Sequence, residues 1–385
     1  MKLKRLLKYG SFSRSMKMLF WGYGFSLSLF SLFSYFFIDP NFTALRWLYS
    51  GVYADYRLLV SFGYVLFIAL LYLFYVLILE NIKTQNVSFL SLGKKIAITA
   101  SVLLFSYPAM LSYDLFNYTT TAKTLFFYKE NPYLIMPIEF LNEPFLSYTH
   151  AANKLALYGP SWLMLSGIPY NLGFSNILLT LFQFKLFAAL FYIGCSYFVW
   201  KLSDNKQSLL LFALNPLVLI ETFVSGHNDI VMMFFVLATI FLILRKQFVI
   251  AFLLFIISVG IKYASIALLP FMVFLAWRVS KNQRIKWKTI WVFAAISMSI
   301  PFLLSPLREE VYPWYAIWFL PFAAMIRKQY VKYLAIAFTL GLLLRYIPFM
   351  YLGTHFGIAP IAKIILTVFP VSVAALCIFV RKRYV

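Results

Sequence analysis

The sequence predicts an all-α polytopic membrane protein, and three observations lead to this fold class. Hydrophobic residues make up 63% of the 385 residues, and charged residues only 12%. A soluble domain typically carries about twice that charged fraction. The apolar residues also gather into about a dozen runs, each near the roughly 20 residues that a helix needs to cross a bilayer. Most of the chain is therefore expected to lie in lipid.

Each predicted helix is an apolar run bounded by charged residues. The roughly 12 runs are Lys17–Ile38, Leu58–Leu79, Lys95–Ser112, Asn176–Trp200, Ser208–Val224, Asp229–Leu244, Phe248–Gly260, Tyr263–Trp277, Thr289–Leu304, Trp314–Ile326, Val331–Pro348 and Ala359–Val380. No small-residue cleavage site follows the basic N-terminus, so the first run is predicted to be a retained helix rather than a signal peptide. Residues 1–385 are predicted to form one domain.

Basic residues set the expected orientation. The formal net charge is +22, and the Lys and Arg residues sit in short clusters between apolar runs, such as Lys94-Lys95, Arg245-Lys246 and Arg327-Lys328. This is the positive-inside pattern of a membrane protein rather than the basic face of a nucleic-acid-binding protein. We therefore expect a multi-pass protein of the plasma (inner) membrane with both termini in the cytoplasm.

One segment, at about residues 155–172, has to stay on one side for the orientations to agree. Gly159-Pro160 and Pro169 are expected to break any helix there, so we predict a re-entrant or interfacial segment. The outer face then carries a loop at about residues 113–154, the turn at Gly226–Asp229 and a loop at residues 305–315. The first loop is long for a structureless connection and is predicted to form amphipathic helices on the membrane, for example at Leu115–Tyr128.

Asp114 is the first candidate catalytic residue, because it follows directly on an apolar run. A carboxylate at the membrane boundary is partly desolvated, which makes it a better base and an acceptor for a sugar hydroxyl. The alternative is that Asp114 only begins the next helix, since Asp favours helix N-termini.

His227, Asn228 and Asp229 place three polar side chains in one turn between two apolar helices. Polar groups there are costly without partners, so a functional site is the default hypothesis. His and Asn can hydrogen-bond sugar or phosphate oxygens, and Asp229 can bind a hydroxyl or a metal. The alternative is an ordinary turn in which Asp229 caps the following helix.

Three further charged residues lie close to the outer face. Glu221 either lines the same cavity or is a paired buried acid. Lys262 can stabilise a leaving phosphate or reach towards lipid headgroups. Arg308 can bind a lipid phosphate, whereas the neighbouring Trp314 and Tyr315 are explained by an aromatic belt.

Several short motifs, read together, resemble the GT-C superfamily of polyprenyl-phosphate-sugar-dependent glycosyltransferases, in particular glycosyltransferase family 87 and bacterial alpha-mannosyltransferases. They occur in the order Tyr113-Asp114-Leu115-Phe116-Asn117-Tyr118, Asn131-Pro132-Tyr133, Tyr158-Gly159-Pro160-Ser161-Trp162, Asn215-Pro216-Leu217 through Glu221 to Gly226-His227-Asn228-Asp229, Gly260-Ile261-Lys262-Tyr263 and Tyr312-Pro313-Trp314-Tyr315 with Trp318 and Pro321. No Asp-X-Asp pair follows the third helix, because Asn117 takes the later polar position. A divalent metal is therefore possible but not supported by a ligand pair.

The resemblance implies a GT-C-like bundle and a mannosyltransferase activity. The sugar, mannose by the resemblance, would move with inversion from a polyprenyl-phosphate donor in the membrane to a glycan or glycolipid acceptor at the outer face. Asp114 would be the general base, with Asp229 as the second candidate catalytic residue. The candidate substrate-binding residues are Asn117, Tyr158, Glu221, His227, Asn228, Lys262 and Arg308. No nucleic-acid partner is expected.

Two other classes remain open. A lipid or small-molecule transporter or flippase would carry ionisable residues deep in the membrane along a path, whereas here they gather at one face. The absence of a visible internal repeat also weakens that alternative. A scaffold for envelope assembly would not need the cluster of His227, Asn228 and Asp229.

Overall fold

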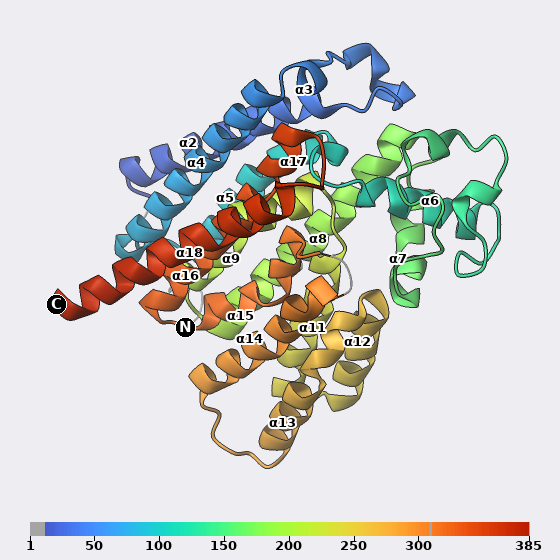
Figure 1. Ribbon diagram of the computed structural model, residues 1–385. Coiled ribbons are helices and arrows are strands. Elements are labelled where there is room, and N and C mark those ends of the chain that lie inside the picture. Colours follow the sequence, from blue (N-terminus) through green and yellow to red (C-terminus); the bar gives the residue numbers. More distant parts are fainter. Residues whose placement is uncertain (1–11, 308–309, 385) are drawn as a thin grey trace.

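The computed structural model describes residues 12–307 and 310–384, and the regular structure in these residues is helical (Figure 1). Seven helices in this part of the chain are long and apolar enough to cross a membrane, or eight if one bent pair counts as a single span. Only 11% to 44% of the most apolar window of each span is buried inside the protein. Large apolar surfaces thus face outwards, as lipid requires. The predicted count of about twelve crossing helices is not confirmed.

The long spans form the body of the bundle. They are α2 (Arg14–Phe33) with η1 (Ser34–Phe37), α4 (Arg57–Asn81) with η3 (Ile82–Thr84), α8 (Ile177–Ser203), η9 (Tyr263–Leu268) with α13 (Leu269–Ser280), α14 (Trp287–Leu304) with η10 (Ser305–Leu307), α16 (Gln329–Leu344) with α17 (Ile347–Leu352), and α18 (Ala359–Tyr384). In Figure 1, α2 and α4 lie along one edge, and α16 and α18 run beside them.

Shorter helices connect and fill this bundle. They are η2 (Thr43–Leu48), α3 (Val52–Asp55), α5 (Phe89–Ser101), η4 (Val102–Phe105), η5 (Pro108–Met110), α6 (Asp114–Phe126), η6 (Pro137–Glu139), η7 (Pro144–Tyr148), α7 (Pro160–Asn171), α9 (Lys206–Ala213), α10 (Pro216–Leu219), η8 (Ile220–Val224), α11 (Asp229–Leu244), α12 (Phe248–Ile261), η11 (Pro313–Trp318) and α15 (Leu320–Met325). At 16 and 14 residues, α11 and α12 are shorter than a full span.

Proline divides several helices that were predicted as single ones. Proline lacks an N–H group and disfavours the α conformation in the residue before it. Asn215 is accordingly extended before Pro216, and the predicted helix Ser208–Val224 bends by 52° there. The predicted helix Trp314–Ile326 is divided into η11 and α15, with Pro321 in the first turn of α15. The predicted helix Lys95–Ser112 stops at Phe105, shortly before η5.

The expectation that proline breaks any helix at residues 155–172 is wrong. Helix α7 runs from Pro160 to Asn171, because Pro160 occupies the first turn, where its missing N–H has no partner to lose. Its 12 residues extend for about 18 Å, which is less than a bilayer core of about 30 Å. That this segment does not cross by itself stays a prediction.

Helix α6 confirms a helix near Leu115–Tyr128 but not its expected place on the membrane surface. Nine of its 13 residues are buried. It packs against α7 and α8 inside the protein. This burial makes α6 a rigid support for the residues at its start.

Tyrosine hydroxyls satisfy the carbonyl groups that the bend after α9 leaves unpaired. Tyr75 from α4 donates to the carbonyl of Leu211 at 2.7 Å, and Tyr23 from α2 donates to that of Leu214 at 2.7 Å. Tyr192 from α8 donates to the carbonyl of Ala213. Broken helices persist inside membrane proteins only where other groups satisfy the backbone in this way. The bend is therefore stabilised by specific hydrogen bonds, and it directs η8 towards the start of α6.

Candidate active site

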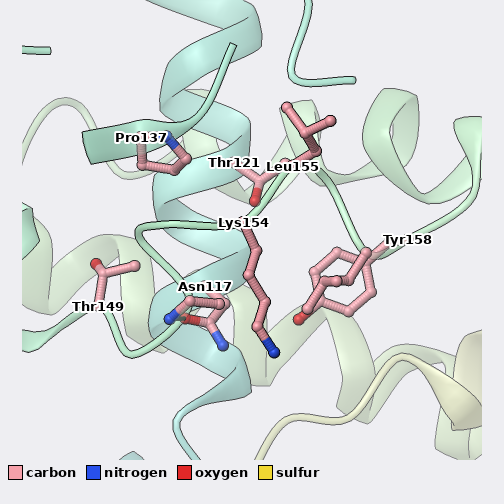
Figure 2. Close-up of a pocket in the computed structure, with 9 residues that line it drawn as sticks. Asn117, Thr121, Pro137, Thr149, Lys154, Leu155 and Tyr158 are labelled. Carbon is pink, nitrogen blue, oxygen red and sulfur yellow. Dashed lines mark hydrogen bonds between the residues drawn. The ribbon is translucent and has the colours of Figure 1, made fainter. Parts of the chain in front are cut away.

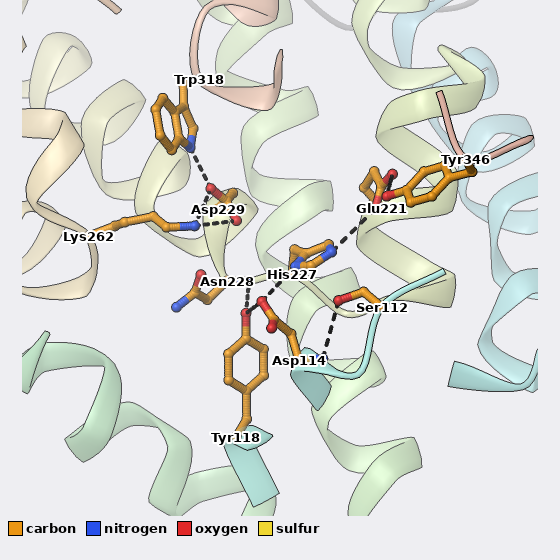
Figure 3. A network of polar contacts seen from close by, with 10 residues as sticks. All are labelled: Ser112, Asp114, Tyr118, Glu221, His227, Asn228, Asp229, Lys262, Trp318 and Tyr346. Atoms are coloured by element: carbon orange, nitrogen blue, oxygen red, sulfur yellow. Dashed lines mark hydrogen bonds and ion pairs between the residues drawn. The ribbon is translucent and has the colours of Figure 1, made fainter. Parts of the chain in front are cut away.

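Six predicted site residues meet in one polar cluster between the helices. Figure 3 shows Asp114 from the start of α6, Glu221 from η8, the turn residues His227 and Asn228, Asp229 from the start of α11, and Lys262 from the end of α12. These residues come from segments up to about 150 positions apart in the chain, so only the packing of α6, η8 and the α11–α12 hairpin brings them together.

Asp114 is held at the first position of α6. Its backbone N–H donates to the Ser112 hydroxyl at 3.2 Å. The partial positive charge at a helix N-terminus favours a carboxylate there. The Tyr118 hydroxyl, one turn along the helix, lies 3.5 Å from a carboxylate oxygen of Asp114. Asp114 keeps 25% of its side chain exposed, which leaves it open to a substrate.

The turn that carries His227 depends on Gly226. The preceding η8 is a π-helix, a rare form that is frequent at functional sites. Gly226 then adopts φ +66°, and a Cβ atom at this position would lie 2.2 Å from the Leu115 side chain. The His227 N–H donates to the Glu221 carbonyl at 3.0 Å and closes the turn. Glycine therefore meets both a conformational and a steric requirement of the turn.

His227 lies between two carboxylates and against an indole ring. Its Nδ1 is 3.3 Å from Asp114 Oδ2, and its Nε2 is 3.3 Å from Glu221 Oε2. The ring stacks on Trp314 with centroids 4.0 Å apart. The side chains of His227 and Glu221 are fully buried. Trp314 thus packs against the cluster, whereas the sequence suggested that it belongs to an aromatic belt at the membrane boundary.

Burial and neighbouring charges act in opposite directions on these groups. Burial lowers the pKa of His227, but Asp114 and Glu221 outweigh it and raise that pKa to about 9. Burial raises the pKa of Asp114, but His227 and then Lys262 outweigh it and hold that pKa below its ordinary value. The desolvation that we expected to make Asp114 a better base is thus overcome. Asp114 is ionised and His227 is protonated at neutral pH.

Lys262 and Asp229 form the second half of the cluster. The Lys262 ammonium lies 2.8 and 3.0 Å from the two carboxylate oxygens of Asp229, and the Trp318 indole N–H donates to the same carboxylate. The ammonium also lies 4.8 Å from the centre of the Tyr315 ring, within the range of a cation–π contact. Asp229 is fully buried, whereas Lys262 keeps 22% of its side chain exposed.

Several buried polar atoms around the cluster have no hydrogen-bond partner within the described residues. Both side-chain polar atoms of Asn228 are among them, together with the hydroxyls of Thr222 and Ser225. Buried polar groups are nearly always satisfied in folded proteins. Asn228 is fully buried between the two halves of the cluster, so its amide is available to a ligand that enters there.

Asn117 and Tyr158 lie next to Asp114 and extend the cluster on that side. Figure 2 shows them around a small pocket, together with Thr121, Thr149 and Lys154. The Asn117 carbonyl oxygen accepts from the Ala151 N–H at 3.2 Å, while the buried Tyr158 hydroxyl has no partner of good geometry among the described residues. Gly159 reaches the α12 backbone, where a Cβ atom would lie 2.2 Å from the Gly260 carbonyl, so Tyr158 is held near Lys262.

The remaining residues complete the comparison with the sequence. Arg308 lies outside the described residues. Tyr118, Trp318 and Tyr346 belong to the cluster, but they were not predicted as site residues from the sequence. Tyr118 and Trp318 stood within or next to the quoted motifs, whereas Tyr346 had no local signal. Across residues 12–307 and 310–384, no group of three or more His, Cys, Asp or Glu side chains is arranged to hold a metal ion.

Comparison with known proteins identifies the family. A family model described as alpha-(1->6)-mannopyranosyltransferase, N-terminal domain, matches residues 39–278. This range is more than half of the chain and includes Asp114, Glu221, His227, Asp229 and Lys262. No curated protein and no solved structure matches the chain significantly.

Proposed function

The chain belongs to the family of alpha-(1->6)-mannopyranosyltransferases, and from this premise we propose that it transfers mannose from a polyprenyl-phosphate donor to a hydroxyl of a glycan or glycolipid acceptor at the outer membrane face. The family supports a membrane glycosyltransferase over a transporter or flippase. The donor lipid, the acceptor, the membrane face and the inverting mechanism are parts of the proposal.

One observation carries the proposed chemistry. In a cluster whose other carboxylates, Glu221 and Asp229, and whose His227 are fully buried, one carboxylate and one ammonium stay accessible: Asp114 at 25% and Lys262 at 22% of their side chains. An accessible base beside an accessible cation is the pair that a transfer from a sugar phosphate requires.

The reaction follows from these two groups. The acceptor hydroxyl oxygen attacks the anomeric carbon, and the bond between that carbon and the phosphate oxygen breaks. The hydroxyl proton passes to the Asp114 carboxylate, which is ionised because His227 and Lys262 favour its charged form. The leaving polyprenyl phosphate keeps the bonding electron pair, and Lys262 stabilises its negative charge. Attack opposite the leaving group inverts the anomeric configuration.

Asn228 and Asp229 are proposed to act around the sugar. The Asn228 amide, which has no partner among the described residues, would hydrogen-bond a hydroxyl of the transferred sugar. Asp229 holds Lys262 through two short contacts and so sets the direction of its ammonium. Asn117, Tyr158 and Arg308 stay proposed substrate-binding residues.

Replacement of Asp114 tests the proposed base. Membranes that contain the protein would receive radiolabelled polyprenyl-phosphate mannose and octyl α-mannopyranoside as acceptor. We expect the wild type to form an α-1,6-linked disaccharide, and Asp114→Asn to lower the rate by about 10²- to 10⁴-fold, the usual size of a general-base contribution.

The control is Asp39→Asn, which changes a carboxylate outside the cluster. It should keep transfer close to the wild-type rate. Asp114→Asn with an intact rate would remove Asp114 from the base role. A wild type that transfers no mannose from this donor would overturn the proposed donor.

A further inference from the structure

Glu221 differs from the equally buried Asn228 because both of its carboxylate oxygens face other side chains of the protein. Glu221 and His227 each have 0% of the side chain exposed. The second carboxylate oxygen of Glu221 accepts a hydrogen bond from the Tyr346 hydroxyl at 2.8 Å. Tyr346 lies between α16 and α17, 125 residues along the chain from Glu221. The order of contacts is therefore Tyr346, Glu221, His227, Asp114, and of the two carboxylates in it only Asp114 reaches the open side.

We propose that Glu221 and Tyr346 are positioning residues that orient His227 towards Asp114, so that the carboxylate proposed as base stays ionised and aimed at the acceptor. This inference rests on the proposed function for its purpose, but the arrangement itself rests on the contacts above. This role differs from the substrate-binding role predicted for Glu221 from the sequence and follows the alternative given there, a paired buried acid.

Three contacts restrain the His227 ring from different directions. Glu221 and Asp114 approach opposite edges of the ring at 3.3 Å, and Trp314 covers one face. Neither ring nitrogen makes a hydrogen bond of good geometry within the described residues, so charge attraction and stacking hold the ring. Loss of Glu221 would leave one edge without a partner. The ring would then be free to turn away from Asp114.

Charge balance explains why two carboxylates share one imidazole. With His227 protonated, the three side chains carry a net charge of −1, whereas a neutral ring would leave two buried negative charges within a few ångströms. When Asp114 accepts the proton of the acceptor, the net charge of the three becomes zero. The buried Glu221 charge thus remains neutralised by His227 throughout the reaction.

Other charged groups near the ring do not replace Glu221. From α6 the ring faces Asp114, and the Tyr118 hydroxyl of the same helix lies 3.5 Å from the Asp114 carboxylate. From the α11–α12 side, Lys262 acts on Asp114 but is paired with Asp229. From η11 the ring meets the uncharged Trp314. Glu221 is therefore the charged group that contacts Nε2 of His227.

The experiment compares Glu221→Gln and Tyr346→Phe with the wild type over pH 6–10. The first readout is the transfer rate. The wild type should lose activity as His227 deprotonates near pH 9. In Glu221→Gln the alkaline limb should move down by about 1–3 pH units, because a carboxylate that favours the protonated ring is gone. Tyr346→Phe should lower kcat, because Glu221 loses the hydrogen bond that holds it. The alkaline limb should stay in place or move to higher pH, because Glu221 keeps its charge.

The second readout does not depend on transfer. The chain has only three His residues, so ¹⁵N-histidine-labelled protein in detergent gives three pairs of ring-nitrogen signals, and His227→Gln assigns one pair. The His227 signal should titrate near pH 9 in the wild type and at lower pH in Glu221→Gln. This readout remains informative even if the proposed donor is wrong.

The matched control is Tyr35→Phe, which also removes a partly buried tyrosine hydroxyl but from the Phe105 carbonyl, away from the cluster. It should leave both the pH profile and the His227 signal unchanged. A uniform loss of activity at all pH values in Glu221→Gln, with an unmoved His227 signal, would reduce Glu221 to a packing residue and overturn the inference.

Discussion

Asp114 and Asp229 are alike in position and unlike in environment. Each is the first residue of a helix, α6 or α11, so the helix N-terminus favours both carboxylates. Asp114 is partly open and faces His227, whereas Asp229 is buried and bound to Lys262 and Trp318. Two carboxylates of the same local type therefore have different environments, which fits the separate roles proposed for them.

The pair of Lys262 and Asp229 gives a prediction at this scale. Lys262→Gln should destabilise the protein by up to about 3–5 kcal/mol, because it leaves a buried carboxylate without its cation. The double variant Asp229→Asn with Lys262→Gln should regain much of that stability, since no charge is then left unpaired. Thermal unfolding in detergent measures this difference.

The same variants separate stability from function. If Lys262 stabilises the leaving phosphate, the double variant should stay inactive although it is folded. A double variant that transfers mannose at the wild-type rate would show that the ion pair is only structural.

At the scale of the element, the bend between α9 and η8 is what directs the site. Pro216 ends one helical segment, Asn215 accepts from the Leu217 N–H at 3.0 Å at the start of the next, and η8 then ends in the turn at Gly226. An unbroken helix over these residues would continue in one direction and would not present the turn to α6. The π-helix and the positive φ of Gly226 therefore act together to present the turn to α6.

Gly226→Ala tests whether the site depends on the conformation of this turn. A Cβ atom at this position meets both the cost of φ +66° and a contact of 2.2 Å with Leu115. The first costs about 1–2 kcal/mol and the second about 1–3 kcal/mol. We expect lower thermal stability and a larger loss of transfer, because the turn carries His227.

Gly357 offers a matched control. It has nearly the same φ, +67°, but a Cβ atom at this position would meet no other atom within 4 Å among the described residues, so Gly357→Ala isolates the conformational cost. Adding Leu115→Ala to Gly226→Ala should recover part of the difference. Equal losses in Gly226→Ala and Gly357→Ala would show that the contact with Leu115 is unimportant.

At the scale of the whole molecule, the apolar surface points to lipid and the polar cluster lies between the helices. The last helix, α18, has only 11% of its apolar window buried, and side chains such as Leu376 are 63% exposed. The residues of the cluster come from or adjoin α6, η8, α11, α12 and η11, and several of them are fully buried. A lipid-linked donor would meet both environments, with its chain in lipid and its phosphate at the cluster.

The sidedness of the bundle is testable by cysteine labelling. In a background with Cys195→Ser and Cys377→Ser, single cysteines would replace the exposed residues Asn131 and Lys281. The positive-inside rule predicts that a membrane-impermeant maleimide labels Asn131→Cys in intact cells but Lys281→Cys only after permeabilisation. The reversed pattern would remove the outer face from the proposed function.

Local patterns in the sequence predicted the class of protein and most of the cluster. Mean hydropathy and the number of Lys and Arg residues in a loop are sums over neighbouring residues. An all-helical membrane protein can therefore be recognised without knowing how the helices pack. Polar residues inside apolar runs are equally visible, which is why Asp114, His227, Asn228, Asp229 and Lys262 were identified from sequence. The helix ends near proline were less well predicted, because a proline can begin a helix as well as end one.

The sequence by itself thus determined that this chain is a membrane protein and which charged residues form most of its candidate site. Only the tertiary structure decided how those residues are paired. Lys262 meets Asp229 across the α11–α12 hairpin, His227 lies between Asp114 and Glu221, and Tyr346 reaches Glu221 from 125 residues away. The physical reason is that a contact between distant segments depends on the bends and the packing of whole helices, which no local pattern of residues contains.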